Sequence, residues 1–188
     1  MATHINYFVK SNSTYKLKNL KAIFCGGAKL EEDTRLSFQK KTNCKILTNY
    51  GLTETSSIVA TEGLKLSSRK KNSVGKILRN NKVKIINQKK FPKENNYKIG
   101  EICVKGENLF KEYFKDKNLT NKIKKNKWLK TGDIGYLDEN KFLFVKDRID
   151  NMFIVSGENV YPSEIEKYLY IFKKIKLGVV VPLPDKYT

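Results

Sequence analysis

The sequence is poor in the residues that build metal centres and disulfide-stapled folds. Its 188 residues include one histidine, His4, and three cysteines, Cys25, Cys44 and Cys103, with no C-x-x-C spacing. This set suggests no zinc site. An odd number of scattered cysteines favours a reducing compartment over a disulfide framework.

Long apolar runs are also missing. The first twelve residues, MATHINYFVKSN, contain no apolar core of signal-peptide length, and no run approaches the length that spans a membrane. The short run 179–181 (VVV) indicates a buried strand instead. From these absences we expect a soluble, cytoplasmic chain.

Acidic residues are scarce beside basic ones. Lysine and arginine total 38 against 19 acids, a net charge of +19, yet only four of the 38 are arginines. A polyanion partner, nucleic acid or an anionic membrane face, is one interpretation. Lysines spread over solvated faces are the other, and the dispersed lysines favour it. An apolar fraction of 39% is enough for a core, in one or two domains.

The first ordered pattern is strand–helix–strand. Residues 21–25 (KAIFC) and 45–47 (KIL) predict buried strands. Between them, residues 31–33 (EED) suit the positive end of a helix, whose face carries Leu30, Thr34 and Phe38. Loops follow each strand, and the carboxyl ends of strands in open α/β sheets are where ligands bind.

The loop after the second strand, residues 49–54 (NYGLTE), carries candidate chemistry. Tyr50 offers a flat ring on which a base can stack, and Gly51 allows close backbone approach. Thr53 offers a hydroxyl to a phosphate oxygen, and Glu54 a carboxylate to Mg²⁺. The plainer alternative is an ordinary strand-to-turn transition with a helix cap.

The middle of the chain is predicted to be rich in β-structure. Residues 1–18 show no clear pattern, 55–73 predict a surface loop, and 118–127 an exposed helix or loop. The aromatic run 110–114 (FKEYF) is interpreted as core packing, with a nucleic-acid stacking surface as the alternative. Strands are expected at 73–78, 83–86, 101–104 and 142–145, an exposed hairpin connection at 87–97, and turns at 131–133 and 138–140.

The stretch 147–166 (DRIDNMFIVSGENVYPSEIE) predicts strand, turn and helix. Ser163 and Glu166 have the spacing of a capping box. Apolar residues then recur at helical spacing, at positions 165, 168, 169 and 172.

Several of these stretches resemble motifs of the adenylate-forming enzymes, which comprise acyl- and aryl-CoA ligases, luciferases and the adenylation domains of nonribosomal peptide synthetases. The resemblance extends from Leu20 to the end of the chain, and the residues at 156–166 (SGENVYPSEIE) are most similar to those of the CoA ligases. The stretches that carry it are CGGA at 25–28, NYGLTE at 49–54, GEICVKG at 100–106, TGD at 131–133 and the stretch 147–166.

The resemblance implies a nucleotide site. It implies that Tyr50 holds the adenine, Thr53 the α-phosphate and Glu54 the magnesium. Asp133 would accept hydrogen bonds from both ribose hydroxyls, because a carboxylate accepts two donors with charge assistance. The further residues implied in ATP or AMP binding are Gly26, Gly27 and Ala28 along the adenine edge, Asn49, Gly51, and Arg148 at the ribose.

It also implies moving parts. Asp150 matches the hinge about which a small C-terminal domain rotates. Ser156 and Gly157 lie where the pantetheine arm of a thiol acceptor would pass. The CoA ligases of this family often have two glycines in this turn, and here Ser156 replaces the first.

The fold implied has three parts. Residues 1–149 would be the C-terminal part of a large AMP-binding domain, first α/β and then a small distorted β-barrel. Residue 150 would be the hinge, and residues 151–188 the beginning of a small α+β lobe. No phosphate loop precedes Gly26 and no catalytic lysine motif follows. We therefore expect a piece of a larger enzyme, with parts missing at both ends, that is inactive alone.

The function expected is that of an ATP-dependent acyl- or aryl-CoA ligase. It would use ATP, Mg²⁺ and CoA or another pantetheine thiol to activate a small carboxylic acid, with no nucleic acid as partner. Three alternatives stay open: a nonribosomal-peptide-type adenylation domain, a non-catalytic nucleotide-binding remnant, and a basic nucleic-acid-binding protein.

Overall fold

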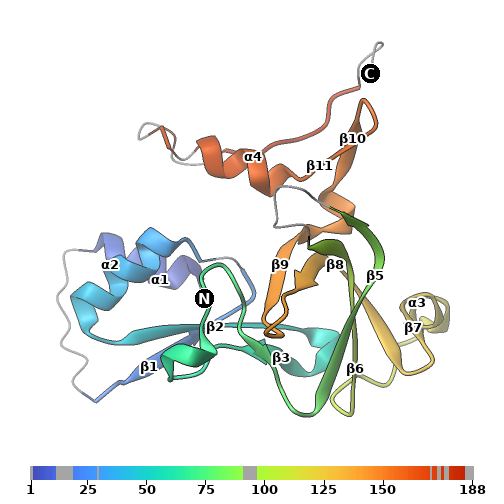
Figure 1. Cartoon of the computed structure of the whole chain (residues 1–188), viewed down its shortest axis with the longest axis horizontal. Helices are drawn as coiled ribbons and strands as arrows, with labels where there is room; N and C mark the ends of the chain where they lie inside the picture. Colours follow the sequence, from blue (N-terminus) through green and yellow to red (C-terminus); the bar gives the residue numbers. More distant parts are fainter. Residues whose placement is uncertain are drawn as a thin grey trace.

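A four-stranded mixed sheet forms the first part of the protein (Figure 1). The computed structural model describes residues 2–11, 19–28, 30–90, 97–169, 171–172, 175 and 178–184. The strands, in order across the sheet, are β1 (Ala22–Cys25), β2 (Lys45–Leu52), β3 (Ser57–Thr61) and β4 (Lys76–Ile77). β1 and β2 are parallel and the other pairs antiparallel, so the predicted strand–helix–strand unit is confirmed.

Two helices pack against β1 and β2. The crossover helix α2 (Glu32–Thr42) begins with Glu32 and Asp33 and ends at Asn43, whose φ of 56° is left-handed. The second helix, α1 (Ala2–Lys10), lies where no structure was expected, and that expectation was wrong. Its buried Ile5 joins Phe38 of α2 in one apolar cluster with partly buried Phe8 and Val9, at the spacing of one helix face.

The surface loop expected at 55–73 was wrong at its start, because β3 lies there. Val59 and Ala60 are fully buried, and β3 pairs with β2 on one side and β4 on the other. Three consecutive apolar residues were too short a signal beside the polar ones around them. The remainder contains a short 3-10 helix, η2 (Leu66–Ser68).

A second, antiparallel sheet follows. Its order is β5-β6-β8-β7, and β9 also pairs with β8. The bounds are β5 (Asn81–Lys90), β6 (Lys98–Gly106), β7 (Lys124–Lys125), β8 (Trp128–Leu137) and β9 (Leu143–Arg148). Among the described residues no pairing closes this sheet, so the small barrel is not confirmed; Figure 1 shows a curved sheet instead. The middle of the expected hairpin connection, 91–96, lies outside the described residues.

The basic stretch at 118–127 contains a helix followed by a short strand. The helix α3 (Lys117–Ile123) is capped by Asp116, whose side chain accepts a hydrogen bond from the Leu119 N–H at 2.8 Å. The strand β7 then pairs with the start of β8. The prediction of an exposed helix or loop was therefore right for the first part only.

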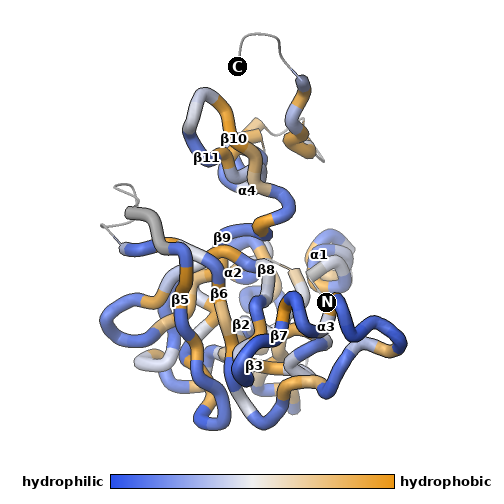
Figure 2. The backbone as a smooth tube through the Cα atoms, turned by 90° about the vertical axis from the view of Figure 1, so that its right-hand side faces the viewer, coloured by the Kyte–Doolittle hydropathy of each residue, from blue (hydrophilic) through white to orange (hydrophobic). Residues whose placement is uncertain are grey.

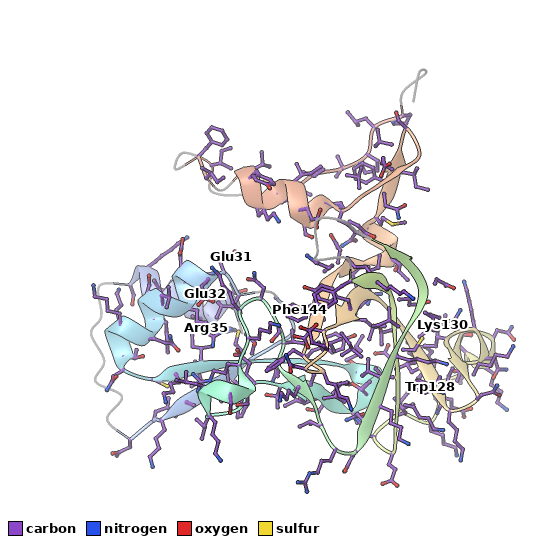
Figure 3. The ribbon with its side chains drawn as sticks, viewed as in Figure 1. Glu31, Glu32, Arg35, Trp128, Lys130 and Phe144 are labelled. Atoms are coloured by element: carbon purple, nitrogen blue, oxygen red, sulfur yellow. The ribbon has the colours of Figure 1, made fainter. Side chains whose placement is uncertain are left out.

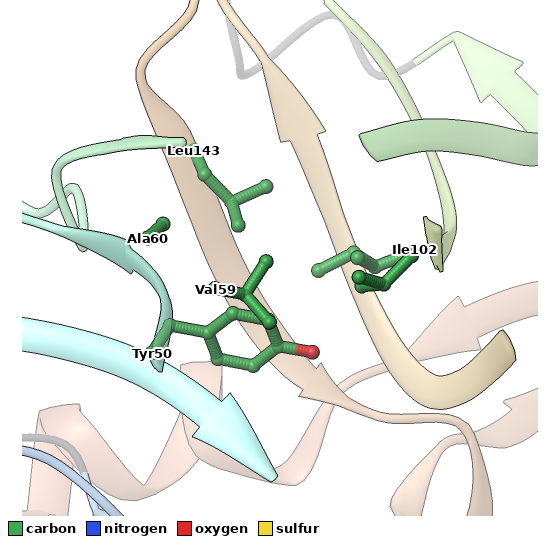
Figure 4. Close-up of a cluster of buried hydrophobic side chains, with 6 residues drawn as sticks. Tyr50, Val59, Ala60, Ile102 and Leu143 are labelled. Atoms are coloured by element: carbon green, nitrogen blue, oxygen red, sulfur yellow. The ribbon is translucent and has the colours of Figure 1, made fainter. Parts of the chain in front are cut away.

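The two sheets share one apolar cluster. Leu143 of β9 forms two backbone hydrogen bonds with the segment before β4. The Val74 N–H donates to the Leu143 carbonyl at 2.9 Å, and the Leu143 N–H donates to the Gly75 carbonyl at 3.0 Å. Side chains from both sheets then meet, as Figure 4 shows. The buried members are Tyr50, Val59, Ala60, Ile102, Val104 and Leu143.

The T-G-D motif is not the tight turn that was predicted. It lies inside β8, where residues 131–133 occupy the gap between the Lys130↔Cys103 and Ile134↔Glu101 pairs, opposite a single residue of β6. Extra residues on one strand make a bulge. Gly132 adopts a φ of +72°, which glycine tolerates without strain.

The last elements lie at one end of the molecule, beyond β9 (Figures 1 and 2). They are η4 (Ile149–Asn151), β10 (Phe153–Val155), β11 (Glu158–Val160) and α4 (Pro162–Leu169). Apolar side chains at this end are exposed, 65% for Ile154 and 61% for Tyr168. Within the described part of the chain, no helix has the length and apolar character needed to cross a membrane.

The predicted capping box of α4 does not form. Pro162 is the first helical residue, so Ser163 lies inside the helix. The Ser163 N–H donates to Asp147 at 3.2 Å, and Glu166 accepts from the Val180 N–H at 3.0 Å. A carboxylate from β9 therefore satisfies the free N–H at this helix end.

Candidate functional site

The motif residues 26–28 and 49–54 lie together at the carboxyl ends of the parallel strands. β2 is longer than predicted, so Asn49, Tyr50 and Gly51 are in the strand, while Thr53 and Glu54 form the 3-10 helix η1 (Thr53–Thr55). An open pocket of about 560 Å³ lies here. Its lining residues are Gly27, Asn49, Gly51, Leu52, Thr53, Ser56, Ser57 and Ile58.

Two glycines allow the chain segments around this pocket to approach closely. A Cβ at Gly26 would lie 1.7 Å from Oδ1 of Asn49, and one at Gly51 would lie 1.8 Å from the Ser57 carbonyl oxygen. The Ser57 oxygen is backbone, so no side chain fits at Gly51, whereas a side chain at Gly26 would force the Asn49 amide to turn aside. Ala28 is exposed, and Gly27 has a φ of +81° with open space around it. The glycines therefore bring the β1 loop against β2, and β2 against β3.

Asp133 receives hydrogen bonds from two sides. The Tyr50 hydroxyl donates to its Oδ2 at 2.6 Å, and Nη1 of Arg148 donates to its Oδ1 at 3.2 Å. Thr131 holds the bulge, because its hydroxyl donates to the Ile102 carbonyl at 2.8 Å and accepts from the Asp133 N–H at 3.1 Å. The bulge thus directs a carboxylate of the second sheet to a tyrosine of the first.

Burial shifts the pKa values of Asp133 and Tyr50. Asp133 is 6% exposed. Its burial raises the pKa of the carboxyl group, the hydrogen bonds and charge of Tyr50 and Arg148 oppose that rise, and the charge of Glu54 adds to it. Burial raises the pKa of the Tyr50 phenol strongly, and the neighbouring Asp133 raises it further. Tyr50 is therefore a hydrogen-bond donor at neutral pH.

The ring of Tyr50 is more enclosed than a base-stacking role suggests. It is 9% exposed and packs among the cluster of Figure 4. Its assignment to the adenine stays a prediction.

Glu54 has a partner that the motif did not indicate. The Tyr113 hydroxyl donates to Oε1 of Glu54 at 2.5 Å, and the Phe110 N–H donates to the Glu54 carbonyl at 2.8 Å. The hydrogen bond to Glu54 and partial burial raise the pKa of Tyr113 to about 12. Tyr113 belongs to the aromatic run 110–114, which was assigned to packing, so its spacing held no signal of this contact.

That aromatic run provides little stacking surface. Phe110 and Tyr113 pack edge to face with centroids 4.8 Å apart, and Phe114 is 87% exposed. A single-strand binding surface relies on successive exposed rings. The packing interpretation therefore holds for Phe110 and Tyr113 and is wrong for Phe114.

Arg148 joins the buried carboxylate to the predicted hinge. Its Nη2 lies 3.5 Å from Oδ2 of Asp150, which is 80% exposed in η4. A Cβ on Gly132 would lie 3.1 Å from the same Nη2. Asp133, Gly132, Arg148 and Asp150 are thus brought together, while the domain boundary at residue 150 stays a prediction.

Ser156 and Gly157 form the two-residue turn of the β10–β11 hairpin. Their φ angles are 49° and 85°, both left-handed, as in the turn type that suits tight hairpins. A glycine in place of Ser156 would adopt this left-handed conformation without the strain that a serine side chain adds. Neither residue lines the pocket described above.

A buried ion pair outside the motifs supports the pocket wall. Nη2 of Arg35 lies 3.1 Å from Oε2 of Glu62, which also accepts from the Thr48 N–H at 2.8 Å. The Glu62 side chain is 1% exposed. Figure 3 shows Arg35 beside Glu31 and Glu32 at the start of α2. This pair ties α2 to β2 and β3.

These features define the class of protein. The motifs through which the sequence resembles adenylate-forming enzymes lie in a glycine-lined pocket at the ends of parallel strands, in the bulged T-G-D strand and in β9, which carries Arg148. The family model of AMP-binding enzymes matches residues 1–114, and the chain belongs to this family.

Relatives and solved structures agree with this assignment. The chain is 34% identical over 178 residues to peroxisomal OPC-8:0-CoA ligase 1 of Arabidopsis thaliana, covering 92% of this chain and 32% of the relative. It is 32% identical over 173 residues to a long-chain-fatty-acid–CoA ligase of Bacillus subtilis, with 92% and 31% covered.

Among solved structures, the o-succinylbenzoate coenzyme A synthetase of Bacillus subtilis, in complex with ATP and magnesium ion, superposes with a TM-score of 0.82. The two are 31% identical, with 98% of this chain and 38% of that chain covered. The chain spans about a third of the length of the relatives it matches.

Proposed function

We propose that the chain forms part of an ATP-dependent acid–thiol ligase, which converts a carboxylic acid to an acyl-adenylate and then transfers the acyl group to CoA or another pantetheine thiol. The observation that carries this proposal is the Tyr50–Asp133–Arg148 cluster, whose Tyr50 stands between two residues that line the glycine-lined pocket, Asn49 and Gly51. Family membership and the CoA ligases among its relatives support it.

The nucleotide is proposed to bind across the two sheets. Gly26, Gly27 and Ala28 would follow the adenine edge, while Thr53 offers a hydroxyl to the α-phosphate. Asp133 keeps lone pairs free after its two observed hydrogen bonds. It can therefore accept the ribose hydroxyls, and the hydrogen bond and charge of Arg148 favour its charged form against the effect of burial.

A magnesium ion fits the chemistry of Glu54. Mg²⁺ binds through one or two carboxylates together with phosphate oxygens and water. A single carboxylate beside the pocket is therefore sufficient protein ligation. When bound, the ion would neutralise phosphate charge. Glu54 would hold it, Thr53 would orient the phosphate, and Tyr113 would orient Glu54.

Two structural assignments belong to this proposal. Residues 1–149 are proposed as part of the large AMP-binding domain and 151–188 as the start of the C-terminal lobe, with Asp150 as the hinge. Ser156 and Gly157 are proposed to face the thiol arm in the transfer pose. In an ATP–pyrophosphate exchange assay we expect the 188-residue chain alone to show no robust exchange.

The test is Asp133→Ala in the complete enzyme, with isothermal titration of ATP. Loss of a charge-assisted hydrogen bond costs about 1.5–3 kcal/mol, so we expect roughly ten- to a hundredfold weaker ATP binding. The control is Asp138→Ala. Asp138 is buried to a similar degree, 5% against 6% exposed, but pairs with Lys70 and has no contact with Tyr50 or Arg148 among the described residues. Equal ATP affinity of Asp133→Ala and the unaltered chain would remove the ribose role.

A further inference from the structure

Two tyrosine hydroxyls each donate to one carboxylate of the site. Tyr50 donates to Asp133 and Tyr113 donates to Glu54. The charge of Glu54 is close enough to Asp133 to raise the pKa of that carboxyl group. A neutral donor on each carboxylate stabilises its charged form without adding a cation that would compete with a metal ion.

The segment that carries Tyr113 is tied to η1 at several points. The Phe110 N–H donates to the Glu54 carbonyl at 2.8 Å, and the Asn108 amide donates to the Thr55 carbonyl at 2.7 Å. On its other side, the Lys124 ammonium donates to the Phe110 and Lys111 carbonyls at 2.5 and 3.1 Å. The backbone next to Tyr113 is therefore held by hydrogen bonds to η1 on one side and to Lys124 on the other.

This contact involves one oxygen of Glu54. Tyr113 donates to Oε1, and within the described part of the chain Oε2 has no hydrogen bond or ion pair. The contact fixes the side-chain direction and leaves one oxygen for a further ligand. Residues that hold a ligating group in this way tune metal affinity in many sites.

We propose that Tyr113 is a positioning residue that orients Glu54 for a divalent cation. This inference rests on the proposed function, because it takes Glu54 as the metal ligand. It adds a residue from outside the motif. Tyr113 touches neither nucleotide nor metal and acts through the carboxylate that it holds.

The experiment uses Mn²⁺ as the probe in the presence of AMP, with free Mn²⁺ followed by electron paramagnetic resonance. Tyr113→Phe removes one oxygen and keeps the ring against Phe110. We expect Mn²⁺ affinity to fall about 10- to 100-fold, the usual effect of losing such a supporting contact. Metal-free AMP affinity, measured by calorimetry, should stay within about twofold, because the contact acts on the metal and not on the nucleotide.

The matched control is Tyr97→Phe. Tyr97 donates to Oε2 of Glu139 at 2.6 Å, a pair of the same chemistry that is exposed and does not line the pocket. This variant should bind Mn²⁺ and AMP like the unaltered chain. Circular dichroism and urea unfolding establish that both variants are folded. A folded Tyr113→Phe chain with unchanged or tighter Mn²⁺ binding overturns the inference, and tighter binding would mean that the hydroxyl blocks the carboxylate.

Glu54→Gln separates this inference from the proposed function. If Glu54→Gln abolishes Mn²⁺ binding and Tyr113→Phe has no effect, the positioning role is wrong while the metal role of Glu54 stands. If Glu54→Gln binds Mn²⁺ normally, or the unaltered chain binds none, the metal role falls and the inference with it. If both are right, adding Tyr113→Phe to Glu54→Gln causes no further loss.

Discussion

Tyr50→Phe tests the contact that joins the two sheets. The change removes one hydroxyl and leaves the ring in its cluster, so packing is preserved while Asp133 loses its 2.6 Å donor. A hydrogen bond to a charged group contributes about 1.5–3 kcal/mol. We expect the free energy of unfolding to fall by that amount, measured by urea denaturation. Each kcal/mol corresponds to roughly 2–4 °C in Tm for a chain of this size.

The stability that Tyr50→Phe loses should depend on pH. Burial already raises the folded-state pKa of Asp133 above its ordinary value. A raised carboxyl pKa means that the folded state binds the proton more tightly, so stability is lost as pH rises through the folded-state pKa. Without the Tyr50 hydroxyl this pKa rises further. The difference in free energy of unfolding between Tyr50→Phe and the unaltered chain should therefore be small at acidic pH and grow towards neutral pH.

The control is again Tyr97→Phe, whose hydroxyl also donates to a carboxylate at 2.6 Å but in an exposed pair. Exposed contacts of this kind contribute roughly 0–1 kcal/mol. The reasoning is refuted if both variants lose the same stability, or if the loss in Tyr50→Phe is identical at pH 4 and pH 7.

Three further changes test the supports of the site. Gly51→Ala should lower the free energy of unfolding by several kcal/mol, because its Cβ would lie 1.8 Å from a β3 carbonyl oxygen. In Gly27→Ala the added Cβ would have no atom within 4 Å, so this variant should lose only about 1–2 kcal/mol, the cost of a positive φ. Urea midpoints that do not separate these two would contradict the argument. Glu62→Ala removes the buried partner of the Arg35 guanidinium and leaves it only the half-exposed Glu32 at 3.9 Å, so it should cost about 3–5 kcal/mol, against under about 1 kcal/mol for Glu32→Ala; equal costs would show that burial of the pair is unimportant. Ser156→Gly should raise the protection of β10–β11 amides from hydrogen exchange, because glycine accepts the φ of 49° without strain; unchanged or lower protection would count against strain in this turn.

Local patterns in the sequence were enough to identify the family and several elements. The β1–α2–β2 unit, the 138–140 turn and the Ser156-Gly157 turn follow from apolar runs, helix-end charges and turn residues, which act over a few positions. The helix α1 was missed although Ile5 and Phe8 stand on one helix face, because a nine-residue helix depends on packing against α2. The strand β3 was missed for a similar reason, since its pairing partners lie elsewhere in the chain.

Contacts between distant residues were decided only by the tertiary structure. The sequence named Asp133, Tyr50 and Glu54 as site candidates through resemblance. It did not indicate that a β8 bulge directs Asp133 to Tyr50, 83 positions away, or that Tyr113 holds Glu54 across 59 positions. The replacement of a local capping box by Asp147 is another such case. Residue type and spacing determine which groups are available, whereas strand pairing and the register shifts of β8 determine which of them meet.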